Sequence, residues 1–530
     1  MLTLAAETLP QLSPEASGML KVALGVYAVF LLGVSVVASR KVKNEEDYVV
    51  AGRRLPLSLA WGTLMATWFG AATINAAAES AKADGLQGVI LDPFACSATL
   101  IFAGLFFAKP LWKMGLFTIA DFYRQRYGPK AELIGSAIQV PSNFSWVALQ
   151  YAALGHIFHV YFDLPFEQGI YWAAGLTLIY TMVGGMWSVT LTDALQLVIA
   201  LFGLLVLGYA VFASPELGNG SVISGVRIAM EKVQTEHPSH LDFFPGSETP
   251  GRAMLIMGWI GAWATGLFGC IPGQDLQQRV FASKDENVAA RACILAGVLY
   301  LVFGLVPVLL GLTSSVILPD VKGNPIPYLA NQYLSSGMTV VLIVAVVAMI
   351  VSTATSAILA PATILGHNLL NRIPGVSKAP LLRDRLCVII VVAGGVALAK
   401  ASESLMGLLD IALSIHLVAL FIPVAMGIYG KPRGELSAVL AMTLGAAAWA
   451  IRFLTENFFL PIPQEIAALH PDPSDKYDYY EYLAEAFPVE SLRTAASYWA
   501  VVPDKFYGFG FCVAGYLIGQ RILKRRGSRT

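Results

Sequence analysis

Residues 55–85 read LPLSLAWGTLMATWFGAATINAAAESAKADG, and this stretch decides how the chain folds. It is apolar enough to cross a bilayer and long enough as well, because about 20 residues span the hydrocarbon core as a helix. Its middle is a poor helix, since Trp68 and Phe69 are moderate helix formers and Gly70 costs roughly 1 kcal/mol relative to alanine. The pattern is compatible with a helix that breaks at membrane depth, or with an unbroken span that packs closely through its small residues.

A break in this span would create a binding site at membrane depth. It would leave backbone carbonyl groups without helical partners, which is tolerated only where they line a protein cavity or hold an ion. The carbonyl end of the first half would attract a cation, and the amide end of the second half would attract an anion or a dipole.

The composition indicates a polytopic membrane protein, a single membrane domain over residues 1–530. Of its 530 residues, 56% are hydrophobic and 13% are charged, whereas soluble proteins carry about 25% charged residues. The formal net charge is zero, which gives no indication of a nucleic-acid partner. The five cysteines lie in apolar segments without a CxxC spacing, so no disulfide framework or thiolate metal site is predicted. The chain shows no catalytic motif, and we expect no enzyme activity.

Apolar segments predict an all-α membrane protein with thirteen transmembrane helices. Basic residues gather in every second connection, so the positive-inside rule places the N-terminus outside and the C-terminus in the cytoplasm. The longest connection on the outer side, residues 456–504, is acidic. The predicted spans are 19–39, 57–82, 86–108, 132–161, 168–187, 190–213, 252–273, 291–318, 337–370, 386–404, 405–430, 436–455 and 505–523.

The seventh predicted span contains a second interruption. Residues 254–273 read MLIMGWIGAWATGLFGCIPG, with three glycines and a proline in the inner half. This span lies five spans after the first interrupted one and therefore enters the membrane from the opposite side. Two interrupted spans at matching positions of inverted units are typical of transporters built from inverted repeats. We predict these repeats at residues 57–213 and 252–430.

A short motif joins the fifth and sixth spans. Residues 184–196 read GGMWSVTLTDALQ, in which the paired glycines allow a tight turn and Asp193 would complement the dipole of the next helix. The stretch also closely resembles the signature of the sodium:solute symporter family, with Gly184, Gly185, Thr192, Asp193 and Gln196 at the motif positions. The resemblance implies that Asp193 lies on the ion pathway.

Further stretches extend the resemblance over about residues 34–432. They are EDYVVAGRRLP (46–56), ATWFGAATINAAAES (66–80), GLFFAKP (104–110), IPGQDLQQRV (271–280) and AMIVSTATSAILAPATILGHNLL (348–370). Within the family they are most similar to the high-affinity choline transporter branch. The resemblance implies a leucine-transporter-type fold, in which the two five-helix repeats form a core whose first and sixth helices are broken.

The resemblance also implies a sodium site. Its ligands would be the carbonyl groups of Ala66, Phe69 and Met349 and the hydroxyl groups of Ser352 and Thr353. Such a set suits sodium, a hard cation that prefers oxygen ligands. The alternative is that both hydroxyls bond to carbonyl groups one turn earlier in their own helix. Sodium would be the coupling ion, and no organic cofactor is expected.

Two tryptophans near the middle of their spans are candidate residues for binding the solute. Membrane tryptophans usually lie at the interfaces, whereas Trp68 and Trp146 lie at mid-depth, where they would either fill the core or bind a cation by cation–π contact. Both resemble aromatic positions of the choline-transporter cation site, and two further positions of that cage are Cys96 and Gly273 here. Asp92 would be either the anionic partner of a cationic solute or a hydrated vestibule residue.

Taken with the motifs, the resemblance implies a sodium-coupled symporter of the cytoplasmic membrane that imports a small organic solute by alternating access. A quaternary ammonium and a zwitterion are the two solute classes considered. The alternative is a receptor or sensor that binds solute on the same fold without net transport. The expected partners are the small solute and membrane lipid.

Overall fold

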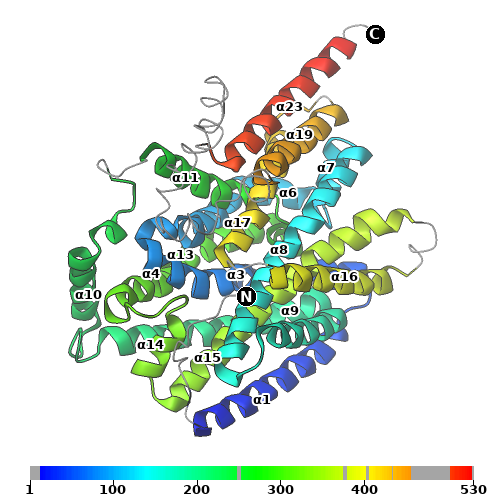
Figure 1. The fold of residues 1–530 in the computed structure, drawn as a ribbon. Coiled ribbons are helices and arrows are strands. Elements are labelled where there is room, and N and C mark those ends of the chain that lie inside the picture. The colour runs from blue at the N-terminus through cyan, green and yellow to red at the C-terminus, as the bar shows by residue number, and fades with distance from the viewer. Residues whose placement is uncertain are drawn as a thin grey trace.

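The computed structural model describes residues 12, 14–246, 252–373, 379–401, 405–432, 434–454 and 502–527. This part of the chain is helical apart from one isolated bridge between Leu55 and Ser283. Helix α1 (Pro14–Ser39) lies at one edge of the bundle, and the paired helices α19 (Glu435–Leu454) and α23 (Asp504–Gly527) lie at the opposite edge (Figure 1). The predicted acidic loop, residues 456–504, falls almost entirely outside the described residues.

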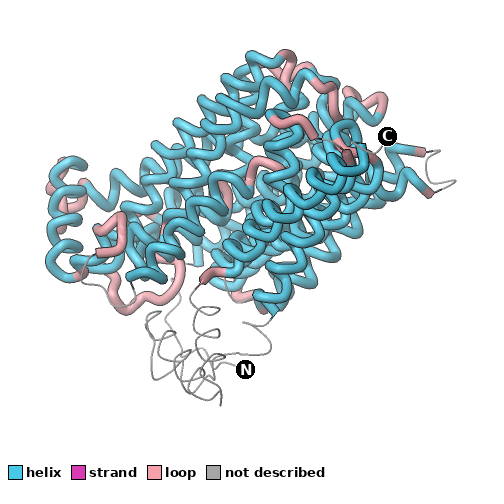
Figure 2. Tube along the Cα trace, turned by 90° about the horizontal axis from the view of Figure 1, so that it is seen from above, coloured by secondary structure: helices cyan, strands magenta, loops and turns pink. Residues whose placement is uncertain are grey.

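Seen from above, the long helices lie side by side and most loops gather at their ends (Figure 2). The helices used below are α2 (Glu45–Val50), α3 (Leu57–Trp68), η2 (Ala72–Ala76), α4 (Ala77–Gly88), α5 (Cys96–Phe102), α7 (Ile119–Arg126), α8 (Pro129–Phe162), α9 (Phe166–Phe212), α11 (Arg252–Ala264), η6 (Thr265–Gly269), α12 (Gln274–Ala282), α13 (Glu286–Ile317), α15 (Ser336–Ile364), η7 (Leu365–Leu369) and α17 (Leu405–His416).

Length and hydropathy identify eight helices that could cross a membrane among the described residues, and one bent pair that would form a ninth crossing. Helix α9 has 47 residues, which corresponds to about 70 Å and exceeds the thickness of a bilayer. A kink at Gly185 (φ 54°, ψ −150°) divides it at the place where the sequence predicts two spans. The total of thirteen crossings stays a prediction.

The first interrupted span is broken at the predicted place. Helix α3 ends at Trp68, η2 and α4 continue the chain, and the two parts are bent by 56°. Phe69 has a non-helical ψ of 64°, and the Gly70 amide donates to the carbonyl of Trp68 at 2.8 Å. The broken alternative is therefore confirmed for this span.

The second interrupted span also contains a break, although its parts together still meet the criteria for one crossing. Helix α11 and the π-helical turn η6 end at Gly269, residues 270–273 form a turn, and α12 begins at Gln274. The Pro272–Gly273 pair explains the turn, because proline cannot donate to a helix and glycine weakens one.

Helix α15 occupies the centre of the bundle. It packs against α1, α3, α8, α9 and α12, and it has the largest buried share of the candidate spans. The break after α3 therefore faces α15, while α8 also contacts α17 and α13 contacts α3, α4 and α5. This arrangement places both breaks among buried helices rather than against lipid.

Candidate functional site

The first break touches α15 at Thr353. The Thr353 hydroxyl donates to the carbonyl oxygen of Ala66 across the helix interface and to that of Met349 in its own helix, both at 3.1 Å. Ala66 can accept this bond because the Gly70 amide, its usual helical partner, donates to Trp68 instead. Three of the five predicted sodium ligands, Ala66, Met349 and Thr353, thus lie together. The Thr353 hydroxyl makes both the hydrogen bond to its own helix and the one to α3.

The other two predicted sodium ligands have different surroundings. Ser352 does not bond back to its own helix in the structure but donates to the carboxylate of Asp193 on α9. Phe69 lies within the break, fully buried, and its ring packs edge-on against Tyr300 with 5.6 Å between ring centroids. The resulting set consists of oxygen atoms only, which is the chemistry that suits a hard monovalent cation.

Asp193 is fully buried and accepts two hydroxyl groups. One bond comes from Thr63 on α3 at 2.5 Å, and the other comes from Ser352. Asp193 lies about two turns beyond the kink at Gly185, so its carboxylate does not cap the first turn of a helix. The interpretation of Asp193 as a helix-start residue is therefore wrong, because the helix begins earlier than the turn motif indicates.

A buried arginine connects the ion residues to the second break. Arg279 on α12 donates to the hydroxyl of Ser356 at 2.5 Å and to the backbone carbonyl of Asp275 at 2.9 Å. Ser356 lies one turn beyond Ser352 on α15. Among the described residues, no salt bridge joins Arg279 to a carboxylate, but its guanidinium lies close enough to Asp193 and Asp275 to interact electrostatically with both.

Residues from both breaks line a cavity with about 400 Å³ of free space. The four predicted cage positions, Trp68, Cys96, Trp146 and Gly273, all lie on its wall. The sequence analysis missed the remaining lining residues, which are Asn143, Cys270, Asp275, Tyr300, Ala412, Leu413 and His416. Only about 20 Å³ of this space is open to the centre of a water-sized sphere, so the walls must move apart to admit an organic solute.

Asp275 is the one acid among the described residues that line this cavity. Its carboxylate accepts a hydrogen bond from Trp68 Nε1 at 2.6 Å. A side chain at Gly273 would place its Cβ 2.6 Å from Asp275 Oδ1, so the carboxylate occupies space that an aromatic residue at position 273 would need. The signal for Asp275 was present in the motif IPGQDLQQRV, as an acid two residues after the proline–glycine pair.

Asp92 does not line the cavity, although the sequence offered it either as the anionic partner of the solute or as a hydrated vestibule residue. It is buried behind Tyr300 and accepts hydrogen bonds from Tyr300 Oη at 2.9 Å and from Thr73 Oγ1 at 3.0 Å. The neighbouring Ala71 amide donates to Gln150 Oε1 at 3.3 Å. At the start of the second half-helix, the Ala71 amide and the Thr73 hydroxyl therefore already have hydrogen-bond acceptors within the protein.

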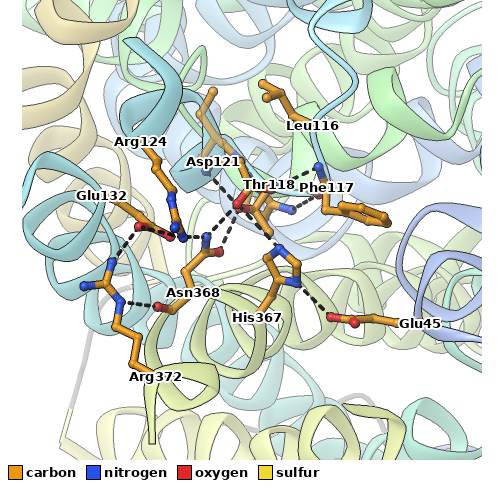
Figure 3. Close-up of polar contacts among 12 residues, drawn as sticks. Glu45, Leu116, Phe117, Thr118, Asp121, Arg124, Glu132, His367, Asn368 and Arg372 are labelled. Atoms are coloured by element: carbon orange, nitrogen blue, oxygen red, sulfur yellow. Dashed lines mark hydrogen bonds and ion pairs between the residues drawn. The ribbon is translucent and has the colours of Figure 1, made fainter. Parts of the chain in front are cut away.

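A polar network surrounds η7, the turn that continues α15, and shares no residue with the cavity lining; it is called the α15-end network below (Figure 3). His367 Nδ1 lies 2.8 Å from Glu45 on α2, and its Nε2 lies 3.5 Å from Asp121 on α7. The Asn368 amide donates to Asp121 at 2.8 Å and to Glu132 on α8 at 2.9 Å. The hydrogen bond with His367 lowers the pKa of Glu45, so this carboxylate stays charged in the network.

We expect Arg372→Ala to destabilise this network. Arg372 donates to the buried carboxylate of Glu132 at 2.5 Å, and removing a charged hydrogen-bond partner costs about 1.5 to 3 kcal/mol. Arg124→Ala is the matched control, because Arg124 approaches the same carboxylate only to 3.7 Å and its side chain is 66% exposed. That change should cost under about 1 kcal/mol. Thermal unfolding in detergent measures both, and equal shifts would contradict the expected ranking.

Comparisons with known proteins agree with this architecture. The model of the sodium:solute symporter family matches residues 48–445. The chain is 25% identical over 516 residues to the human high affinity choline transporter 1, covering 90% of this chain and 83% of that protein. It is 26% identical over 369 residues to the sodium/glucose cotransporter of Vibrio parahaemolyticus, covering 64% of this chain and 66% of that protein.

Among solved structures, the fold is similar to that of a Na⁺-coupled sialic acid symporter in a substrate-bound outward-open state. The TM-score is 0.72 at 17% sequence identity, with 95% of this chain and 97% of that chain covered. At this identity the likeness concerns the fold alone. The family match spans most of the chain and includes both breaks, the Asp193 motif and the Ser352–Thr353 pair. The chain belongs to the sodium:solute symporter family.

Proposed function

We propose that this membrane symporter imports a small organic cation together with sodium by alternating access. The observation that carries the proposal is Asp275, a carboxylate that shares one cavity with the indole rings of Trp68 and Trp146. Its side-chain hydrogen bond comes from a neutral donor, Trp68 Nε1, and the nearby cation Arg279 is shared with a second acid, Asp193. One negative charge therefore remains for a cation to balance, and the indole faces attract the same cation.

A cation explains the cavity better than a zwitterion does. The carboxylate of a zwitterion would need the amide end of the second half-helix, near residues 71–73. The Ala71 amide already donates to Gln150, and the Thr73 hydroxyl already donates to Asp92. A solute carboxylate would also be repelled by Asp275 in the same cavity.

For sodium, we retain the ligand set Ala66, Phe69, Met349, Ser352 and Thr353. The Thr353 hydroxyl already lies within 3.1 Å of two of these carbonyl oxygens, so little rearrangement is needed to surround an ion. Sodium at this point would hold the break after α3 against α15. Because α3 also carries Trp68, ion binding would favour the state in which the solute cavity is assembled. Asp193, bonded to Ser352, would receive the ion along its pathway.

The proposed membrane arrangement follows from the same elements. Residues 57–213 and 252–430 would form two inverted repeats of a leucine-transporter-type core, within thirteen crossings. The positive-inside rule places the N-terminus outside, the C-terminus in the cytoplasm and the α15-end network on the cytoplasmic side. Opening of that network would release ion and solute into the cell, since it ties α15 to α2, α7 and α8.

Uptake into proteoliposomes tests the function directly. We expect labelled choline, used as a probe cation, to accumulate under an inward sodium gradient and not under an equal potassium gradient. Unlabelled choline should compete, whereas glucose, proline and betaine should compete weakly. Solute binding without sodium-driven accumulation would favour the receptor alternative. Competition by a neutral sugar or a carboxylate alone would refute a cationic solute.

The double change Ser352→Ala and Thr353→Ala should weaken sodium activation. Loss of two hydroxyl ligands is expected to raise the sodium concentration for half-maximal uptake by roughly 10- to 100-fold, with solute selectivity unchanged. Thr363→Ala is the control, because Thr363 is buried on the same helix but bonds only to Leu359 in its own helix. An unchanged sodium activation curve in the double variant would place the ion elsewhere.

A further inference from the structure

His416 is a second polar group on the wall of the solute cavity. It lies at the end of α17, is 3% exposed, and its Nε2 lies 2.8 Å from the hydroxyl oxygen of Ser142 on α8. Its other ring nitrogen, Nδ1, is buried and has no hydrogen-bond partner among the described residues. Buried polar atoms are normally paired, so an unpartnered nitrogen on a cavity wall points to a ligand.

The hydrogen bonds around Ser142 indicate which nitrogen carries the proton. The Ser142 hydroxyl has one proton, which it donates to the carbonyl of Gln139 at 2.9 Å. With that proton directed to Gln139, the Ser142 oxygen accepts from His416, and this arrangement corresponds to the tautomer with the imidazole proton on Nε2. Nδ1 consequently carries a lone pair and can only accept a hydrogen bond.

We propose that His416 Nδ1 accepts a hydrogen bond from the transported solute and selects for a hydrogen-bond donor on it. The inference rests on the proposed function and deepens it. Asp275 and His416 are then two acceptors in one cavity, one charged and one neutral. The solute they fit is a small cation that carries a separate hydroxyl or N–H group. A solute with a carboxylate at that position would face acceptors at both points.

Three probes separate these possibilities by competition against labelled cation uptake in proteoliposomes that contain the full-length protein. Choline combines a quaternary ammonium with a hydroxyl group. Propyltrimethylammonium has a methyl group in place of that hydroxyl, and betaine has a carboxylate in place of the hydroxymethyl group. The wild type should prefer choline over propyltrimethylammonium by at least about 10-fold, because the analogue leaves Nδ1 unpaired. Betaine should compete least.

His416→Ala should remove this preference without changing recognition of the ammonium group. We expect the inhibition constant of choline to rise by about 10- to 100-fold, while that of propyltrimethylammonium changes less than about 3-fold. His416→Gln can present an amide oxygen and should retain part of the preference. Ser414→Ala, a buried change on the same helix away from the cavity wall, is the control and should retain all of it. Because the readout is a ratio between two solutes, a merely less active variant would not mimic the result.

The failures of the two proposals are distinguishable. If neither cation competes in the wild type, the proposed cationic solute is wrong. If both cations compete equally, and His416→Ala leaves their ratio unchanged, the role of His416 is wrong while the cation proposal stands. If betaine competes best, the histidine donates rather than accepts, and the assignment of its lone pair is overturned.

Discussion

Asp275→Asn should strongly reduce sodium-driven uptake of organic cations at solute concentrations that half-saturate the wild type. The substitution keeps the size of the side chain and removes the negative charge from the cavity wall. Truncating one partner of a buried charge pair at an interface costs about 2 to 5 kcal/mol, so the apparent affinity should fall by at least roughly 30-fold. Direct binding of labelled choline to the purified variant separates lost affinity from a slower transport cycle.

Asp92→Asn is the control variant that tests which of the two carboxylates, Asp92 or Asp275, interacts with the solute cation. Asp92 is more deeply buried than Asp275, which is partly exposed, and it is bonded to Thr73 and Tyr300 and lies outside the cavity. This variant should keep more of its cation affinity than Asp275→Asn does, even if it folds less stably. The opposite ranking would identify Asp92 as the anionic partner of the solute and would contradict the proposed role of Asp275.

Gly70→Ala should reduce uptake as strongly as Asp275→Asn does, but by disturbing the proposed sodium site. A Cβ atom at Gly70 would lie 2.3 Å from Thr353 Oγ1 and 2.8 Å from Thr353 Cβ, distances at which α3 and α15 must separate. Such a shift would pull the Ala66 carbonyl away from the Thr353 hydroxyl, so we expect sodium-dependent uptake to fall to background. The measurement is the sodium dependence of solute binding, together with thermal unfolding to confirm that the variant folds.

Gly62→Ala is the matched control for that substitution. Gly62 lies on α3 as well, but a Cβ there would meet no atom closer than Ala194 Cβ at 4.0 Å. Sodium activation should be close to that of the wild type in this variant. Normal sodium activation in both glycine variants would show that the contact between Gly70 and Thr353 is not needed for ion binding.

The first break could be predicted from local sequence because its cause is local. A glycine next to aromatic residues weakens the helix at Trp68 whatever the rest of the chain does. What the break touches could not be predicted in this way. Thr353 lies hundreds of residues further along, in a span whose composition is that of any buried membrane helix. Family resemblance supplied the pairing of Thr353 with Ala66, and the structure brings the two residues together.

The solute cavity was predicted only in part for a related reason. Trp68, Trp146, Cys96 and Gly273 were predicted because aromatic residues at mid-depth are unusual and because the four positions resemble the cation cage of the choline-transporter branch. Asp275 follows a proline–glycine turn, where an acid usually stabilises the start of a helix, and this ordinary explanation concealed it. His416 ends the stretch LMGLLDIALSIH, which carries no sign that it faces a cavity. Its position depends on how α17 packs against α8.

The charged group Asp193, Asp275 and Arg279 has an electrical consequence. With these three side chains ionised and Asp92 neutral, the empty binding region would carry one net negative charge, and it would carry one net positive charge with the proposed sodium and monovalent cation bound. A negative-inside voltage then drives the loaded protein inward and the empty protein back outward, at about 2.3 kcal/mol per unit charge for about 100 mV. Both halves of the cycle would be electrogenic. Voltage steps applied without solute should therefore displace charge.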